Sequence, residues 1–139
     1  MLPMHQAHDR VQKAAVCVSP LFPSPILRPA SPTKLIEYMA LGRPAVANEH
    51  PEQSLILAES RAGICVGWSP QDFAKAICAL FSNPAEADAM GRRGREYVRS
   101  HRTYALVAAD VAKIYSSLFP ELEGRVVCID RDPPTQDGV

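Results

Sequence analysis

The chain has 139 residues, and its 15 Lys and Arg residues balance 15 Asp and Glu residues, so the formal net charge is zero. This length fits one small domain, and fractions of 47% hydrophobic and 22% charged residues are typical of a folded globular protein. The balanced charge and the 6% aromatic content speak against a nucleic-acid-binding protein. No run approaches the roughly 20 consecutive apolar residues that span a bilayer, so we expect no transmembrane segment.

The four cysteines suggest a reducing compartment. Cys17, Cys65, Cys78 and Cys128 lie far apart, without the paired spacing of metal or redox sites, and we therefore expect no metal. The first three lie in apolar runs, where cysteine behaves as a small core residue. The first ten residues also lack the apolar core of a secretion signal. Reduced thiols and a cytoplasmic location follow as expectations.

The first predicted elements are a strand, a loop and a helix. Residues 14–18 (AAVCV) form a short apolar run that predicts a buried strand. Residues 19–32 contain five prolines and predict a packed loop. Residues 31–42 predict a helix, with Ser31 as the cap, Pro32 at the first helical position and Gly42 as the stop.

The apolar residues of this helix recur at helical spacing and are expected to face the core; they are Leu35, Ile36, Met39 and Ala40. Lys34 and Glu37 fall outside that stripe. A break at Arg43-Pro44 follows, and residues 45–47 (AVA) predict the next short strand.

The second half of the chain repeats the alternation. We expect a helix over 52–61, a strand over 64–66, and helices from Ser69 to near Asn83, from Asn83 to about His101, and over 104–118. Helices alternating with short apolar strands indicate an α/β fold: a three-layer, Rossmann-like domain with a short parallel sheet flanked by helices. Three strands are fewer than a complete doubly wound domain has, so the domain is expected to be partial.

The predicted domain covers residues 1–120, and residues 121–139 are interpreted as a flexible acidic tail. That tail holds five acidic residues against two basic ones. Its composition, with two adjacent prolines and a glycine, favours loose attachment.

The start of the helix at residue 31 is the strongest candidate site. A helix N-terminus presents free N–H groups and the positive end of its dipole, and it lies beyond the carboxyl end of a strand. Ser31 and Thr33 add hydroxyls and Lys34 adds a charge for phosphate oxygens. Glu37 suits the diol of a ribose. From the residues alone, an ordinary capped helix with a solvent-facing glutamate explains the pattern as well.

Two further features have both a functional and an ordinary interpretation. His50 follows a predicted strand on the side where a ligand would lie, either as a contact to a donor phosphate or sugar or as a simple loop residue. Arg92, Arg95, Arg99 and Arg102 share one helical face, either for an anionic surface or as a solvated face.

The motifs resemble a known family. The run SPTKLIEYMALGRPAVAN (31–48), followed by HPEQ and SRAGICV, resembles the C-terminal donor-binding domain of GT-B-type glycosyltransferases, most closely the retaining "group 1" enzymes of family four. The later stretches NPAEADAMGRRGREYV (83–98) and HRTYALVAADVAKIY (101–115) are similar to that family's closing helices. The resemblance covers about residues 14–118.

The resemblance implies a retaining glycosyltransferase that uses a UDP- or GDP-sugar as donor, holds no permanent cofactor and serves polysaccharide biosynthesis. It assigns Glu37 to the ribose of the nucleotide and Ser31, Thr33 and Lys34 to the neighbourhood of the diphosphate. Another glutamate of the family falls on Pro29 here, so no catalytic residue is assigned.

The resemblance also implies partners. A carbohydrate or a lipid-linked molecule would be the acceptor. The family's N-terminal acceptor domain has no counterpart in the sequence, so the chain is expected to be a fragment. Peripheral attachment at the inner membrane face is an alternative to a freely cytoplasmic protein.

Two other functional interpretations remain open. One is a non-catalytic remnant or interaction module, favoured by the small number of predicted strands. The other is a piece of a nucleotide-sugar epimerase of the same architecture. A generic dinucleotide-binding module is disfavoured, since no G-x-G-x-x-G follows any predicted strand.

Overall fold

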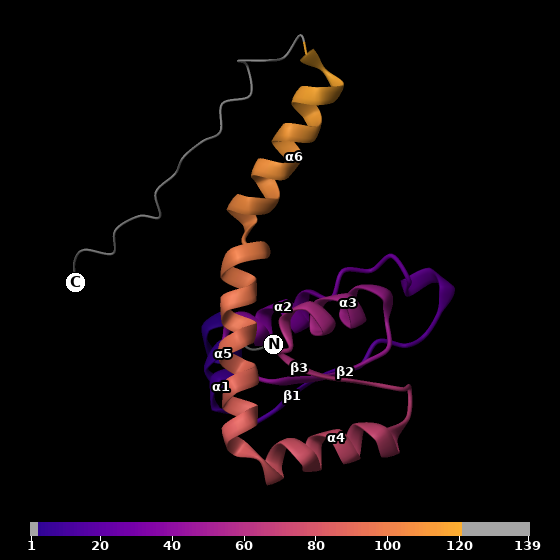
Figure 1. Cartoon of the computed structure of the whole chain (residues 1–139), viewed down its shortest axis with the longest axis vertical. Coiled ribbons are helices and arrows are strands. Elements are labelled where there is room, and N and C mark those ends of the chain that lie inside the picture. Colours follow the sequence, from indigo (N-terminus) through magenta and orange to yellow (C-terminus); the bar gives the residue numbers. More distant parts are fainter. Residues whose placement is uncertain (1–2, 121–139) are drawn as a thin grey trace, which may run out of the picture. The chain divides into compact units, whose positions relative to one another are not determined.

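The computed structural model describes residues 3–120 and has an α/β fold. Three strands, β1 (Cys17–Ser19), β2 (Ala45–Asn48) and β3 (Gly63–Val66), form a parallel sheet in the order β1-β2-β3 (Figure 1). Ser19 pairs with Ala47 and Asn48 pairs with Val66, so the three strands end at the same edge of the sheet. The predicted short parallel sheet is confirmed.

The helices after β1 follow the predicted order, with small shifts at their ends. The helices of the described residues are α1 (Met4–Lys13), α2 (Thr33–Ala40), α3 (Pro51–Ser60), α4 (Pro70–Ser82), α5 (Pro84–His101) and α6 (Tyr104–Leu118). The proline-rich loop contains one short 3-10 helix, η1 (Pro25–Leu27). As predicted, α4 and α5 begin at capping residues: the side chains of Ser69 and Asn83 accept hydrogen bonds from backbone N–H groups in the first turn.

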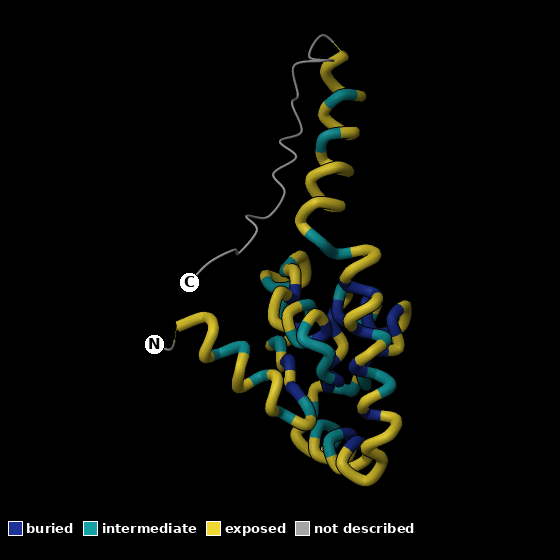
Figure 2. The backbone as a smooth tube through the Cα atoms, turned by 90° about the vertical axis from the view of Figure 1, so that its left-hand side faces the viewer, coloured by how far each residue is buried: buried dark blue, intermediate teal, exposed yellow. Residues whose placement is uncertain are grey.

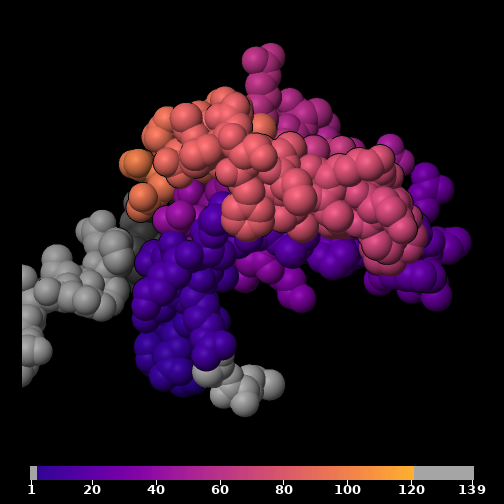
Figure 3. Space-filling view, turned by 90° about the horizontal axis from the view of Figure 1, so that it is seen from below, coloured from indigo at the N-terminus to yellow at the C-terminus, as the bar shows by residue number. Residues whose placement is uncertain are grey.

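The sheet is covered on both faces. In Figure 1, α2 and α3 lie on one face and α4 lies on the other, and Figure 3 looks directly onto α4. Strand β2 is buried on both sides because its residues alternate between two cores. Ala45 and Ala47 join Leu35, Met39 and Ile56 beneath α2 and α3. On the opposite face the cluster consists of Val46, Ala76, Leu80 and Ala87.

Helix α5 packs mainly against α2 and closely approaches the residues just before β2 and β3. The contact depends on two glycines, since a methyl group at Gly91 would overlap the backbone oxygen of Gly42, and one at Gly94 would lie 3.0 Å from Cβ of Ala62. Gly42 itself adopts a φ of 72°, which ends α2 with a left-handed residue. The predicted stop at Gly42 is therefore confirmed.

Several predictions about individual side chains are wrong. Ala40 and Cys78 are exposed because they lie off the buried stripes of α2 and α4, and Cys65 is exposed on the edge strand β3. Cys17 is buried as expected, and burial raises the pKa of its thiol despite the opposing charge of Arg43. Cys128 and the predicted acidic tail lie outside the described residues.

The chain divides into two compact units, Met1–Arg102 and Thr103–Val139. Every residue of the two core clusters belongs to the first unit. Figure 2 shows its buried residues gathered in its interior, whereas α1 buries none. In the second unit, α6 buries none of its residues, including the apolar ones that recur at helical spacing.

Candidate functional site

The edge where the strands end carries a buried polar network. Asn48, the last residue of β2, is fully buried, and its side chain bonds both backbone groups of Leu21. The Leu21 N–H donates to Oδ1 over 2.7 Å, and Nδ2 donates to the Leu21 carbonyl over 2.9 Å. These two bonds satisfy an otherwise costly buried amide and fix the first part of the loop after β1.

Gln53 connects the ends of two strands to the first turn of α3. Its fully buried side chain donates to the Asn48 carbonyl over 3.1 Å and accepts from the Ser19 hydroxyl over 2.6 Å. The ends of β1 and β2 are therefore held in one arrangement.

His50 fixes the second part of the same loop. The residue is only 7% exposed, and Nε2 lies 2.7 Å from the Leu27 carbonyl. Since a carbonyl only accepts, Nε2 carries the proton and donates. Nδ1 is buried and has no hydrogen-bond partner among the described residues. We call Asn48, His50 and Gln53 the loop clamp, because together they position the segment that leads into α2.

The start of α2 differs from the prediction. The helix begins at Thr33, Pro32 precedes it, and no side chain caps it, so the predicted capping by Ser31 and the first helical position of Pro32 are wrong. The reason is a tight turn in which the Thr33 N–H bonds the Ser31 carbonyl over 3.0 Å, leaving the Ser31 side chain exposed.

The four predicted site residues lie together on and just before α2. Ser31, Thr33, Lys34 and Glu37 are all exposed. Thr33 and Lys34 precede Glu37 by four and three residues, so their side chains lie one helical turn from its carboxylate. No ion pair involves Lys34 or Glu37 within residues 3–120. A carboxylate, an ammonium and hydroxyls are thus available to a ligand on one side of this helix.

A cavity of about 530 Å³ opens between the loop and α3 at the same edge of the sheet. It is lined by Pro23, Ser24, Pro25, Arg28, Glu49, His50, Pro51 and Ser54. Arg28 precedes Ser31 by three residues, a chain length of at most roughly 11 Å. The cavity and the start of α2 are therefore neighbouring parts of one edge.

Sequence reasoning singled out His50 but missed the rest of the clamp and cavity. Asn48 offered a signal, because a polar residue that ends an apolar strand at the carboxyl edge must find a partner. The sequence offered no such signal for Arg28, Glu49 and Gln53, because their neighbours in space come from distant parts of the chain.

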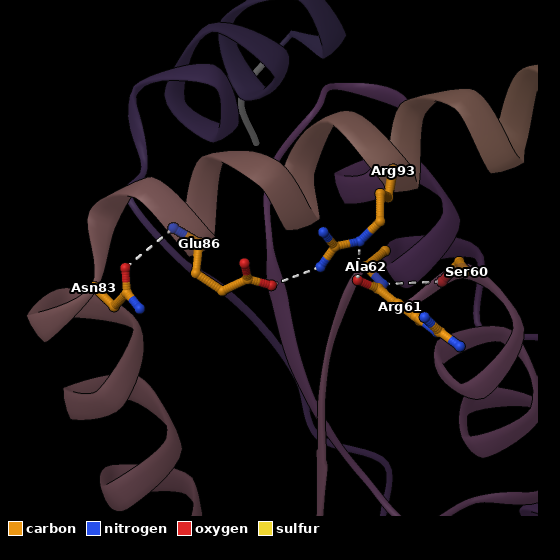
Figure 4. Close-up of polar contacts among 6 residues, drawn as sticks. All are labelled: Ser60, Arg61, Ala62, Asn83, Glu86 and Arg93. Atoms are coloured by element: carbon orange, nitrogen blue, oxygen red, sulfur yellow. Dashed lines mark hydrogen bonds and ion pairs between the residues drawn. The ribbon is translucent and has the colours of Figure 1, made fainter.

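The arginines of α5 do not form one free basic face. Arg102 pairs with Glu52 at 3.0 Å. Arg93 donates to Glu86 over 2.7 Å and to the Arg61 carbonyl over 2.9 Å (Figure 4). The remaining members, Arg92, Arg95 and Arg99, are exposed and have no carboxylate partner in the described part of the chain. This arrangement favours the solvated-face interpretation, with two arginines used to join elements.

The described residues hold no cluster of three or more histidine, cysteine, aspartate or glutamate side chains able to bind a metal ion. None of the helices between residues 3 and 120 is long and apolar enough to span a membrane.

Comparison with known proteins identifies the family of the chain. Its fold is similar to that of sucrose-phosphate synthase from Thermosynechococcus elongatus, with a TM-score of 0.71 and 26% identity over 81% of this chain. The chain spans 27% of the length of that protein, so it corresponds to a part of it. No curated protein matches the chain at a significant level. The family model "Glycosyl transferases group 1" matches residues 3–83, more than half of the chain. The expected glycosyltransferase-like α/β architecture is confirmed, and the chain belongs to the group 1 glycosyl transferases.

Proposed function

We propose that this chain binds a nucleotide-sugar donor and takes part in transferring its sugar, with retention of configuration, to a carbohydrate or lipid-linked acceptor. The proposal rests on the position of Glu37. This residue lies on α2, the helix that follows the loop at the carboxyl edge of the sheet, and its exposed carboxylate forms no ion pair in the described part of the chain. Membership of the group 1 family supports glycosyl transfer as the reaction class.

The proposed donor lies along α2. The two oxygens of the Glu37 carboxylate accept from the two ribose hydroxyls. Lys34, the hydroxyls of Ser31 and Thr33, and the free N–H groups at the helix start face the diphosphate. When the bond between sugar and diphosphate breaks, negative charge develops on the leaving group, and these positive groups stabilise it.

No residue of this chain is assigned as a general acid, base or nucleophile. Pro29 stands where the family often has a glutamate, and a proline has no group that transfers a proton. We infer that the chain supplies donor binding and stabilisation of the leaving group, and that an acceptor-binding domain supplies the rest. A UDP- or GDP-sugar, a cytoplasmic setting and a role in polysaccharide biosynthesis belong to the same proposal.

Calorimetric titration of the purified chain with UDP, GDP, ADP and NAD tests the proposal. We expect one nucleoside diphosphate to bind, and Glu37→Gln to weaken it about tenfold or more, since hydrogen bonds to a charged group contribute roughly 1.5–3 kcal/mol. Asp88→Asn, which removes an exposed carboxylate from α5, is the matched control and should bind like the wild type.

Thermal unfolding of both variants checks that they remain folded. Equal affinity of wild type and Glu37→Gln would contradict the assignment of Glu37. Absence of any binding by a chain that unfolds cooperatively would favour a non-catalytic module instead.

A further inference from the structure

Helix α6 carries an apolar face that is open to solvent. Five of its residues follow one another at alternating spacings of three and four, and they are Tyr104, Val107, Val111, Ile114 and Leu118. Their exposed fractions lie between 46% and 93%, and we call these five residues the seam. An isolated helix of 15 residues is only marginally stable in water, so α6 gains stability when a partner covers the seam.

The spacing of the seam indicates that its partner is another helix. Apolar residues that alternate at three and four positions form one narrow stripe, and two such stripes interlock side chain between side chain. The centre of the seam consists of Val107, Val111 and Ile114. These β-branched side chains are stiff, so they lose little freedom when they are packed.

The charges of α6 lie outside the seam. The helix has two charged side chains, Asp110 and Lys113, and they pair with each other over 3.1 Å on its exposed surface. No charge on the seam would therefore repel an identical seam. A membrane surface is a poorer partner, because helices that bind it carry several basic residues on their polar face, and α6 has one lysine.

The chain as a whole also suits association with its own copies. Its formal net charge is zero, so two copies do not repel each other at long range. Covering the seams of two copies would remove on the order of 1,000 Å² of surface from water, which is the size that a specific interface needs.

We propose that α6 is a dimerisation helix, and that its seam packs against the seam of a second copy of this chain. The two copies are related by a two-fold axis, so the same five residues form both sides of the interface. The proposal goes beyond the proposed function, because no residue assigned to the donor belongs to α6.

Sedimentation equilibrium of the full chain, between about 5 and 500 µM, tests the proposal. We expect a monomer that converts to a dimer within this range. The helix content measured by circular dichroism should rise over the same range, because pairing stabilises α6.

Three substitutions at exposed positions of α6 make the test specific. Ile114→Lys places a charge in the seam and should weaken the dimer at least tenfold, whereas Ile114→Leu keeps the seam apolar and should preserve it. Ala109→Lys adds the same charge outside the seam and should leave the dimer unchanged. Trp68, the only tryptophan, lies in the first unit, and its fluorescence in urea checks that this unit is equally stable in every variant.

Two results would overturn the proposal. One is a monomer at every concentration, whether α6 then stays exposed or packs against its own chain. The other is a dimer that Ile114→Lys leaves intact, because a different surface would then join the copies. Failure of the proposed function is a separate outcome, since Glu37→Gln is expected to weaken nucleotide binding and to leave the dimer unchanged.

Discussion

At the scale of single residues, the site depends on side chains that bond backbone groups far away in the sequence. Asn48 is the clearest case, because both ends of its amide are used by Leu21, which lies 27 residues earlier. Alanine at this fully buried position would remove the partners of the half-buried Leu21 N–H and carbonyl.

We therefore expect Asn48→Ala to lower the free energy of unfolding by about 2–4 kcal/mol, as measured by urea denaturation. Ser31→Ala is the control, since the Ser31 side chain is exposed and caps nothing. It should change stability by less than about 0.5 kcal/mol. A loss of similar size in both variants would contradict the role assigned to Asn48.

A second residue-scale prediction concerns alkaline pH. Burial, together with the hydrogen bond to Glu59, raises the pKa of the Tyr97 hydroxyl. In the unfolded chain a tyrosine loses its proton near pH 10, before the folded protein does. The unfolded state then binds fewer protons, so stability that is fully present below about pH 10 falls as pH rises further.

Urea denaturation between pH 8 and 11 checks this expectation. Tyr97→Phe should show a shallower loss of stability above pH 10 than the wild type. The remaining slope is attributed in part to Cys17 and Tyr38, whose pKa values burial also raises. Tyr104→Phe, which removes an exposed hydroxyl, should follow the wild type, and an identical slope in Tyr97→Phe would contradict the prediction.

At the scale of elements, α5 depends on the absence of a side chain where it crosses α2. We expect Gly91→Ala to destabilise the chain by roughly 2 kcal/mol or more, because the new methyl group would overlap the backbone oxygen of Gly42. Gly67→Ala is the control, since its added carbon would lie 3.4 Å from a carboxylate oxygen of Asp72, an ordinary contact. Thermal unfolding measures both, and equal stability of the two variants would refute the close packing.

The elements themselves were predictable because their signals are local. Short apolar runs mark the three strands, and Ser69-Pro70 and Asn83-Pro84 mark the starts of α4 and α5. The hydrogen bonds that position the site were not predictable, because the bonds from Asn48 to Leu21 and from His50 to Leu27 join residues more than 20 positions apart. One local pattern gave a wrong prediction. Serine is a common N-cap residue, but the side chain of Ser31 caps nothing, and its carbonyl instead accepts a hydrogen bond from the Thr33 N–H in a tight turn.

At the scale of the whole molecule, the first unit contains its own core. Every residue of both buried clusters precedes Arg102, and α6 buries none of its residues. We therefore expect a chain that ends at Arg102 to unfold cooperatively, with a free energy of unfolding within about 0.5 kcal/mol of the full chain. Urea denaturation of both chains tests this expectation, and a non-cooperative transition in the shorter chain would contradict it.

The proposed contact between Glu37 and the ribose of a nucleotide donor is tested by one calorimetric double-mutant cycle. Wild type and Glu37→Gln are each titrated with the preferred nucleoside diphosphate and with its 2′,3′-dideoxy analogue. We expect the substitution to weaken binding of the ribonucleotide about tenfold or more and to leave the affinity for the dideoxy analogue unchanged, because that ligand lacks the hydroxyls that the carboxylate accepts from. The same loss with both ligands, or no loss with either, would contradict it.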